Sequence, residues 1–278
     1  MLIHMVQHFA AGFGHDDKVL HAHAKLARQV YARLNGEDHA RLYGIGVGGA
    51  HIALFVIGLT DKVAQAVVEV LAIARFGNQV TGGGVNIARA GREMTRLAEL
   101  TGVPVVSTIM GKGAVPSGHR LYVGNIGIHG SFAANLAVSK CDLLFSIGTR
   151  FNDRITGRTE AFAREASIVH IDIDAASISR NISVDIPVVA DAKSAISTLL
   201  EKAAPLPTGE WLAQLERWKQ QHPLRMKPSA LSPQAILQAV NHCFEHAIIA
   251  TDVGQNQLWA TQFLALDEHR RLQTSGGL

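Results

Sequence analysis

Four loops rich in glycine and polar residues carry side chains that could bind a charged ligand. They are Ser107–Gly113, Gly124–Gly130, Gly148–Arg154 and His170–Asp174. Arg150 and Arg154 could bind phosphate groups, and Asp172 could accept a hydrogen bond from a ribose hydroxyl. The set therefore indicates an extended ligand that carries phosphate. The alternative is that Arg150, Asp153 and Arg154 form a structural ion-pair cluster.

Two glycine clusters could also hold phosphate on their backbone amides. Gly82–Gly84 stand before a predicted helix, whose free amides and dipole suit a diphosphate, although a plain tight turn is the alternative. Gly44–Gly49 fit the G-x-G-x-x-G pattern of dinucleotide sites, and Glu69 follows about twenty residues later. Because no apolar strand precedes this second cluster, we interpret it as a flexible loop.

Short apolar strands alternate with periodic helices along the part of the chain that carries these loops. Strands are predicted at residues 103–109, 142–147, 168–173 and 186–189. One helix is predicted behind Gly82, with Gly102 and Pro104 ending it and with an apolar face formed by Ile87, Ala90, Met94, Leu97 and Ala98. Asp191 is the predicted N-cap of a helix with Ile196, Leu199 and Leu200. This order indicates an α/β fold with a doubly wound parallel sheet, whose ligand crevice lies at the carboxyl ends of the strands.

A second α/β unit is predicted after a connector at residues 204–230, which contains Pro205, Pro207 and Pro223. Ser232 and Pro233 have the types expected at the N-cap and first position of a helix. That helix is expected to bury four residues, namely Ile236, Val240, Cys243 and Phe244, and residues 247–251 form the next predicted strand. One helix and at most two strands do not make an independent domain, so we expect 231–278 to be the truncated start of a larger one.

Residues 1–80 form an atypical segment that we leave unassigned. They contain no proline and seven of the fourteen histidines. Helices are predicted at residues 18–34 and 62–75, but no strand is predicted before Gly82, since residues 77–81 read as a poor one. The composition indicates a translated wrong frame or a fusion. The predicted organisation is therefore an unassigned segment at 1–80, a central domain at 81–203, a connector and a truncated unit.

Composition excludes several classes of protein. Apolar residues make up 47% of the 278 residues, charged residues make up 18%, and the net charge is +3. These values suit a soluble α/β protein without a nucleic-acid or membrane partner. Cys141 and Cys243 form neither a C-x-x-C pair nor a disulfide framework, which favours a reducing compartment. The start lacks a signal peptide and the longest apolar run, Ile52–Leu59, is too short to span a bilayer, so we expect a cytoplasmic protein.

The loops and their flanking residues recur as an ordered set of motifs. In order they are Gly82–Val85, Thr108–Gly111, Ile126–Gly130, Ile147–Gly157, His170–Asp174, Asp185–Ala192, Thr251–Ala260 and Thr274–Leu278. Together they resemble the large catalytic subunit of the acetolactate synthase family of thiamine-diphosphate-dependent enzymes. The resemblance covers residues 82–278, which correspond to the central domain and the start of the diphosphate-binding domain.

This resemblance implies a transferase of branched-chain amino acid biosynthesis. Such enzymes decarboxylate pyruvate and condense the product with a second 2-oxo acid, using thiamine diphosphate, Mg²⁺ and a structural FAD. They work as homodimers and can take a regulatory small subunit. The implied FAD contacts are Gly82, Gly83, Gly84, Thr108, Ile109, Met110, Gly127, Ile128, His129, Gly148, Thr149, Arg150, Arg154, Asp172, Ile173, Asp191 and Ala192. The implied thiamine diphosphate contacts are Val253, Gly254, Gln255 and Asn256.

Several positions depart from the family pattern. Asn152 and Asn256 replace an aspartate and a histidine, Ala190 replaces a glycine, and Ala175–Ser177 replace Pro-Ala-Glu. Neither the glutamate that activates the thiamine nor the Gly-Asp-Gly metal motif is found, so we name no catalytic residue or metal ligand and expect the chain to be inactive alone. The alternatives are a non-catalytic FAD or nucleotide-binding remnant, another carboligase such as glyoxylate carboligase or pyruvate oxidase, and a degenerate gene product.

Overall fold

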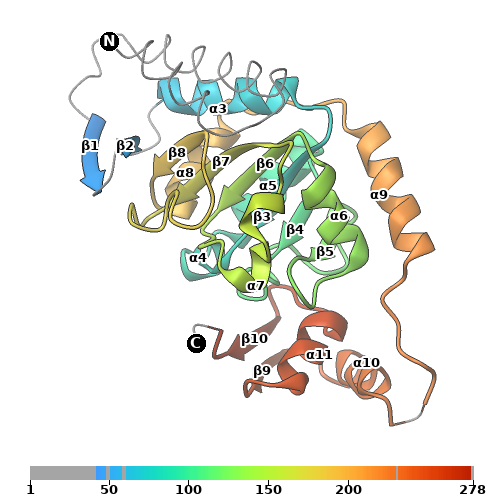
Figure 1. The fold of residues 1–278 in the computed structure, drawn as a ribbon. Coiled ribbons are helices and arrows are strands. Elements are labelled where there is room, and N and C mark those ends of the chain that lie inside the picture. The colour runs from blue at the N-terminus through green and yellow to red at the C-terminus, as the bar shows by residue number, and fades with distance from the viewer. Residues whose placement is uncertain (1–41, 48–50, 58–60, 230, 277–278) are drawn as a thin grey trace.

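A sheet of eight strands forms the centre of the computed structural model, which describes residues 42–47, 51–57, 61–229 and 231–276 (Figure 1). The spatial order is β1-β2-β8-β7-β6-β3-β4-β5. The strands are β1 (Leu42–Val47), β2 (His51–Ile57), β3 (Gly77–Thr81), β4 (Val105–Ser107), β5 (Tyr122–Asn125), β6 (Leu143–Ile147), β7 (Ser167–Asp172) and β8 (Ile186–Val189). β1 and β2 pair antiparallel, whereas all other neighbours in this sheet pair parallel.

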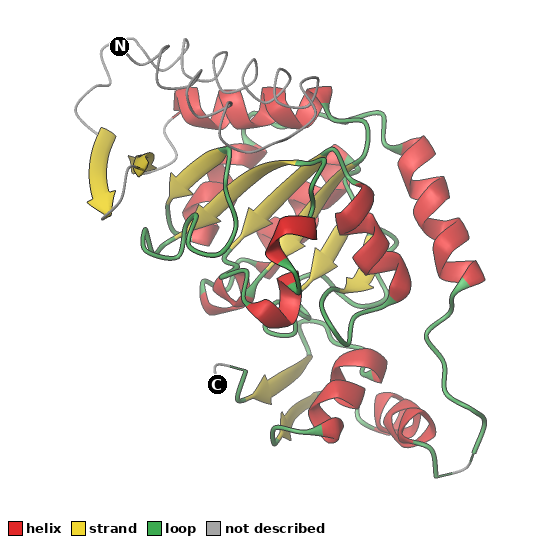
Figure 2. Ribbon diagram, in the orientation of Figure 1, coloured by secondary structure: helices red, strands yellow, loops and turns green. Residues whose placement is uncertain are grey.

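Helices cover both faces of the sheet (Figure 2). They are α3 (Asp61–Ile73), α4 (Gly83–Ile87), α5 (Gly91–Thr101), α6 (Phe132–Lys140), α7 (Asp153–Thr156), a 3₁₀ turn at Thr159–Ala161, α8 (Ala192–Leu200) and α9 (Gly209–Gln221). One core cluster joins α3, α4, α5 and α8 to the first face, and a second joins α6 and α9 to the other. The predicted doubly wound α/β fold is confirmed.

Four strands and several helix ends lie where the sequence predicts them. The predicted strands correspond to β4, β6, β7 and β8. Gly102 ends α5 in the left-handed conformation with φ of 72°, as expected of a glycine at a helix C-terminus. Asp191 accepts a hydrogen bond from the backbone N–H of Ser194 and so caps α8. The prediction of a helix at 62–75 corresponds to α3.

Strand β3 overturns the expectation that no strand precedes Gly82. All five of its residues are buried, and it lies between β6 and β4 in the middle of the sheet. Both amide side chains donate hydrogen bonds inside the protein, although the oxygen of Gln79 has no partner among the described residues. Asn78 donates to the carbonyl of Ala137 at 2.9 Å and accepts from the Trp211 indole at 3.3 Å, while Gln79 donates to Thr101 at 3.3 Å. Burial of these amides is therefore tolerated, and polarity alone was a misleading signal.

The predicted helix behind Gly82 is in fact two helices. Arg89 adopts a positive φ of 53° between α4 and α5, which breaks the helix. Because of the break, Ile87 is 85% exposed, whereas Met94 and Leu97 are fully buried as expected. The first two residues of the loop predicted at Gly124–Gly130 belong to the edge strand β5.

The C-terminal unit comprises α10 (Pro233–Cys243), β9 (Ala247–Thr251), α11 (Gln255–Phe263) and β10 (Arg270–Thr274). Ser232 caps α10 and Pro233 begins it, as predicted. The predicted burial on α10 is wrong, because no residue of α10 is buried and Ile236 is half-exposed. β9 and β10 form a separate two-stranded parallel sheet, which is too small to cover the helix. Phe244, at the end of α10, is likewise exposed.

One buried arginine holds the C-terminal unit together. Arg270, at the start of β10, is 5% exposed. Its guanidinium donates to the carbonyls of Phe244, Ala265 and Asn241, each at 2.8 Å. These bonds link the end of α10, the loop after α11 and the start of β10. A cation with several donors therefore fixes three segments that share only a small apolar cluster.

The segment before residue 81 departs from its prediction. Gly44 and Gly46 lie in β1, so the interpretation as a loop is wrong for residues 44–47, whereas Gly48 and Gly49 lie outside the described residues. The next described element is the strand β2 rather than a helix, unlike the strand-turn-helix context of a dinucleotide site. The core cluster on the first face includes Ala64 and Val67 of α3. The predicted helix at 18–34 lies outside the described residues. Within the described ranges, no helix is long and apolar enough to cross a membrane.

Candidate ligand-binding crevice

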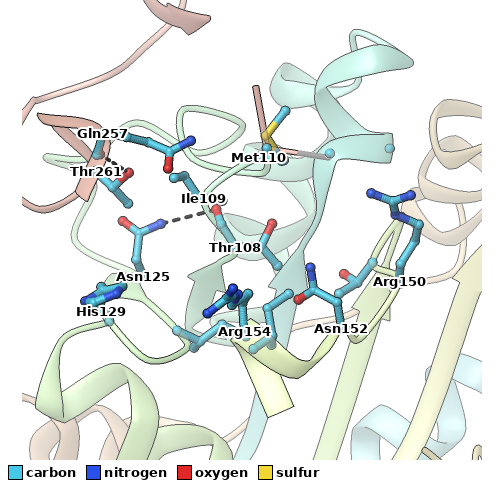
Figure 3. Close-up of a pocket in the computed structure, with 18 of the residues that line it drawn as sticks. Thr108, Ile109, Met110, Asn125, His129, Arg150, Asn152, Arg154, Gln257 and Thr261 are labelled. Carbon is cyan, nitrogen blue, oxygen red and sulfur yellow. Dashed lines mark hydrogen bonds between the residues drawn. The ribbon is translucent and has the colours of Figure 1, made fainter. Parts of the chain in front are cut away.

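A crevice of about 690 Å³ lies at the carboxyl ends of the parallel strands (Figure 3). β3 and β6 are neighbours in the sheet although far apart in sequence, so the loops that follow them leave in opposite directions. A ligand site at such a reversal of strand order is general for open α/β sheets. The loops after β3, β4, β5, β6 and β7 all contribute lining residues. The predicted meeting of the four polar loops is confirmed.

Glycines allow the loops after β3 and β6 to approach each other closely. The backbone N–H of Gly84 donates to the carbonyl of Gly148 at 3.1 Å. A Cβ on Gly82 would lie 2.0 Å from that carbonyl oxygen, and one on Gly84 would lie 2.7 Å from the Gly148 Cα. Gly148 itself has a positive φ of 65°. These positions therefore require glycine, and the result is a floor of exposed backbone in the crevice.

The loop after β5 is fixed by amide side chains. Asn135 of α6 donates to the carbonyl of Gly127 and accepts from its backbone N–H, both at 2.9 Å. The backbone N–H of Ile128 donates to the carbonyl of Arg154 at 2.9 Å. Asn125 donates to the carbonyl of Thr108 at 3.2 Å, as Figure 3 shows. Residues 126–130 are thereby held against α7 and against the loop after β4.

Two guanidinium groups give the crevice its positive charge. Arg150 and Arg154 both line it and are exposed. In the described part of the chain neither forms an ion pair, so the alternative of a cluster with Asp153 is not what the structure contains. Unpaired guanidinium groups beside exposed backbone suit a phosphate-bearing ligand.

Asp172 supplies the carboxylate of the crevice. Burial raises the pKa of Asp172, while the backbone N–H of Asp174, which donates to it at 2.9 Å, and the charge of Arg150 act in the opposite direction. Its carboxylate lies at the end of β7, where it could accept a hydroxyl hydrogen bond. The same wall carries Ile173, which is 72% exposed, so a flat apolar group would find contact beside the carboxylate.

His170 lies behind this wall and is fully buried. Neither ring nitrogen makes a hydrogen bond of normal geometry, and its ring packs against Phe151 with centroids 4.9 Å apart. Burial lowers the pKa of His170 to about 4, and the nearby Thr149 backbone offsets only part of this effect. The imidazole is therefore neutral at ordinary pH. It does not line the crevice.

The C-terminal unit closes one side of the crevice. Val253, Gly254, Gln257 and Thr261 line it from the start of α11 and the loop before it. Figure 3 shows Gln257 and Thr261 across the opening from Arg150 and Arg154. Residues 275 and 276 also line it, and a Cβ on Gly276 would lie 2.2 Å from the Met110 sulfur. The crevice is therefore shared by both units.

Most residues named from the sequence line this crevice. The six that do not are Gly82, Gly127, Asp191, Ala192, Gln255 and Asn256. Gly82 and Gly127 shape the lining loops, whereas Asp191 caps α8 and Ala192 is part of the core. Lining residues that the sequence reasoning did not name as contacts include Ile87, Asn125, Asn152, Asp174, Gln257, Leu258 and Thr261. Asn125, Asn152 and Asp174 lie in loops that the sequence had already indicated. Gln257, Leu258 and Thr261 lie in α11, and only the folded structure shows that this helix reaches the crevice.

The chain is similar to known proteins in this same region. Residues 64–199 match the family described as "Thiamine pyrophosphate enzyme, central domain". The probable acetolactate synthase large subunit of Methanocaldococcus jannaschii is 40% identical over 211 residues, which are 72% of this chain and 36% of that protein. The acetolactate synthase large subunit of Cyanidium caldarium is 38% identical over 204 residues, which are 70% of this chain and 35% of that protein.

A plant relative matches with a similar identity over a similar part of the chain. The chloroplastic acetolactate synthase 1 of Nicotiana tabacum is 38% identical over 227 residues, which are 78% of this chain and 34% of that protein. The chain thus spans about a third of the length of the curated relatives that it matches.

Proposed function

We propose that this chain, whose residues 64–199 match the thiamine pyrophosphate enzyme central-domain family, binds FAD in the crevice and serves acetolactate synthase-type carboligation. The substrates would be pyruvate and a second 2-oxo acid, and the product an acetohydroxy acid. The relatives that are 38–40% identical to it over 204–211 aligned residues are named for this activity. The observation that carries the FAD proposal is the joining of unpaired Arg150 and Arg154 with the glycine floor at one crevice.

The crevice fits FAD chemically in three respects. The two guanidinium groups would receive the diphosphate, and the glycines at 83, 84 and 148, which lack side chains, would let it approach the floor of the crevice closely. Asp172 would accept from a ribose hydroxyl, and Ile87 and Ile173 offer apolar contact for a ring. The volume of about 690 Å³ is in the range of sites for ligands of this class. Here FAD would be structural.

The thiamine diphosphate and Mg²⁺ sites fit less completely. Val253 and Gly254 line the crevice and could contact the thiamine cofactor, whereas Gln255 and Asn256 do not line it. In the described part of the chain no cluster of three or more histidine, cysteine or carboxylate residues could hold a metal ion. Bound thiamine diphosphate would supply carbanion stabilisation. We propose that this chain alone does not catalyse the reaction, and that a homodimer or a further chain would be needed to complete the site.

The first experiment is a titration of the purified chain with FAD, in which flavin fluorescence measures binding. We expect binding, and we expect Arg154→Gln to weaken it by about tenfold, because one charged hydrogen bond to phosphate is lost. Arg158→Gln, on an exposed residue outside the crevice, is the matched control and should bind like the parent chain. Absence of FAD binding by the parent chain would contradict the proposal.

A second measurement addresses carboligation. The FAD-loaded chain is incubated with thiamine diphosphate, Mg²⁺ and pyruvate, and acetolactate is assayed. We expect bound flavin without product from the chain alone. Acetolactate formation would contradict the proposed inactivity, and product from glyoxylate but not from pyruvate would favour the glyoxylate carboligase alternative.

A further inference from the structure

A buried lysine crosses the boundary between the central sheet and the C-terminal unit. Lys112 follows β4 in the loop that lines the crevice, and only 7% of the residue is exposed. Its ammonium donates to the backbone carbonyl of Thr261, which is itself buried and lies in the last turn of α11. The two residues are 149 positions apart in sequence. Complete burial of a lysine is rare, so this contact requires an explanation.

The surroundings of the Lys112 side chain are uncharged. Burial is the cause of the lowered pKa of Lys112, which is about 8, and no charged neighbour contributes to it. The hydrogen bond of its ammonium goes to the carbonyl of Thr261 in α11, while Asn86 donates to the backbone carbonyl of Lys112 at 3.2 Å. Among the described residues the amine therefore has no carboxylate partner, and its polar contact is the end of a helix whose carbonyls attract cations.

Helix α11 connects this contact to the ligand crevice. Its C-terminal turn is held by Lys112, while Gly254 and Gln257 at its other end line the crevice, and Figure 3 shows Gln257 across the opening from Arg154. A displacement of the C-terminal turn would move these groups, because an α-helix of 9 residues is short and stiff. Other contacts also cross this boundary. Ser117 and Leu266 are joined by two hydrogen bonds of 2.8 and 3.0 Å, and Gln262 of α11 donates to the carbonyl of His129 at 3.1 Å. Arg92 pairs with Glu268 at 2.7 Å on the exposed surface.

We propose that Lys112 is a positioning residue, whose buried contact with the last turn of α11 fixes the opposite end of that helix at the crevice. This inference rests on the proposed function only where it concerns ligand affinity. The placement of α11 can be tested without any ligand. Lys112 contacts one lining residue, Thr261, directly, and its effect on Gly254 and Gln257 at the other end of α11 is transmitted through the helix.

Three tryptophans make the placement of α11 measurable. Trp259 lies in α11 and is half-buried, whereas Trp211 and Trp218 lie in α9 and pack on the central sheet. Labelling with 5-fluorotryptophan gives one ¹⁹F signal for each. In Lys112→Met, which keeps the length of the side chain without its amine, we expect the Trp259 signal alone to shift or broaden. Arg92→Ala, at the same boundary, is the matched control and should leave all three signals in place.

The pH profile separates positioning from general support of the fold. In a Cys243→Ser background, which removes the thiol of the adjacent helix α10, the Trp259 signal should titrate with a midpoint of about 8. That titration should be absent from Lys112→Met. An unchanged Trp259 signal in Lys112→Met would overturn the proposal. If all three signals move in Lys112→Met, the pH titration of the Cys243→Ser chain distinguishes positioning from a general loss of fold. A Trp259 signal that does not change with pH in that chain overturns the proposal.

Ligand affinity links this placement to the crevice. Lys112→Met should weaken FAD binding by about tenfold, the effect of one lost hydrogen bond, and Arg92→Ala should not change it. If the parent chain binds no FAD, the proposed function fails, yet the ¹⁹F comparison still decides the role of Lys112. FAD binding of unchanged affinity in Lys112→Met would overturn the link between α11 and the crevice.

Discussion

The central sheet and the C-terminal unit are both built from alternating helices and strands, but they differ in how much they bury. Two large clusters of buried apolar residues cover the two faces of the central sheet, with Phe145 and Val169 at zero exposure. The C-terminal cluster has three buried members, Ala260, Leu264 and Leu266. Similar local patterns therefore produce unequal cores. Independent stability requires enough elements to enclose the apolar faces, which only the central sheet has.

The largest expected effect comes from emptying the core of the central sheet. Phe145→Ala should lower the free energy of unfolding by about 3–5 kcal/mol, because a fully buried aromatic ring leaves a cavity. Urea denaturation followed by circular dichroism would measure it. Leu264→Ala, in the C-terminal unit, should change this main transition by less than about 0.5 kcal/mol. An equal loss in both variants would show that the two regions unfold as one.

His170 should make the central sheet sensitive to acid. In the unfolded chain the histidine has its ordinary pKa of about 6.5, whereas burial lowers the pKa of His170 in the folded protein to about 4. Between pH 6.5 and pH 4 the unfolded state therefore binds more protons, and acid shifts the equilibrium toward unfolding. The free energy of unfolding is unaffected by this group above pH 6.5 and falls as the pH is lowered, by up to about 3 kcal/mol near pH 4. Urea titrations at several pH values would measure this slope. In His170→Gln the slope should be shallower, and an unchanged slope would assign the acid sensitivity to other groups.

Close backbone packing beneath the crevice gives a smaller expected effect. A Cβ on Gly111 would lie 1.9 Å from the carbonyl oxygen of Thr81. Gly111→Ala should therefore lower the unfolding free energy by about 1–3 kcal/mol through forced backbone displacement. Gly118→Ala is the matched control, because nothing lies within 4 Å of the added atom. Thermal denaturation of both variants makes the comparison, and equal midpoints would contradict the observed packing.

The smallest expected effect lies on the outer face of the small sheet. Ile248 of β9 is 65% exposed. Ile248→Ala should leave the main unfolding transition within about 0.5 kcal/mol of the parent chain, because little apolar contact is lost. The same denaturation series checks it. A loss of several kcal/mol would mean that this face is covered in solution, and would weaken the contrast between the two regions.

Signals that act over a few residues were readable from the sequence. Gly102 ends α5, Asp191 caps α8, and Ser232 with Pro233 begins α10, because each feature depends only on local backbone geometry. The apolar strands β6 and β7 were found for a related reason, since burial on both faces gives continuous apolar runs. Their order placed the polar loops at one edge of the sheet.

Features that depend on distant partners were not readable. Strand β3 was missed because the partners of Asn78 and Gln79, on α6, α9 and α5, are known only once the chain has folded. Burial on α10 was overestimated because periodicity shows which face is apolar, but not whether anything covers it. The contact of Lys112 with α11 left no local signal at all. Tertiary context decided all three.

The three carbonyl bonds of Arg270 have a thermal consequence for the C-terminal unit. The heat capacity of unfolding increases with exposure of apolar surface and decreases with exposure of polar surface. A unit that is held by a guanidinium and only three buried apolar residues therefore exposes little apolar surface when it opens. Its opening should carry a small heat-capacity change, so that its stability falls almost linearly with temperature while that of the central sheet follows a curved dome.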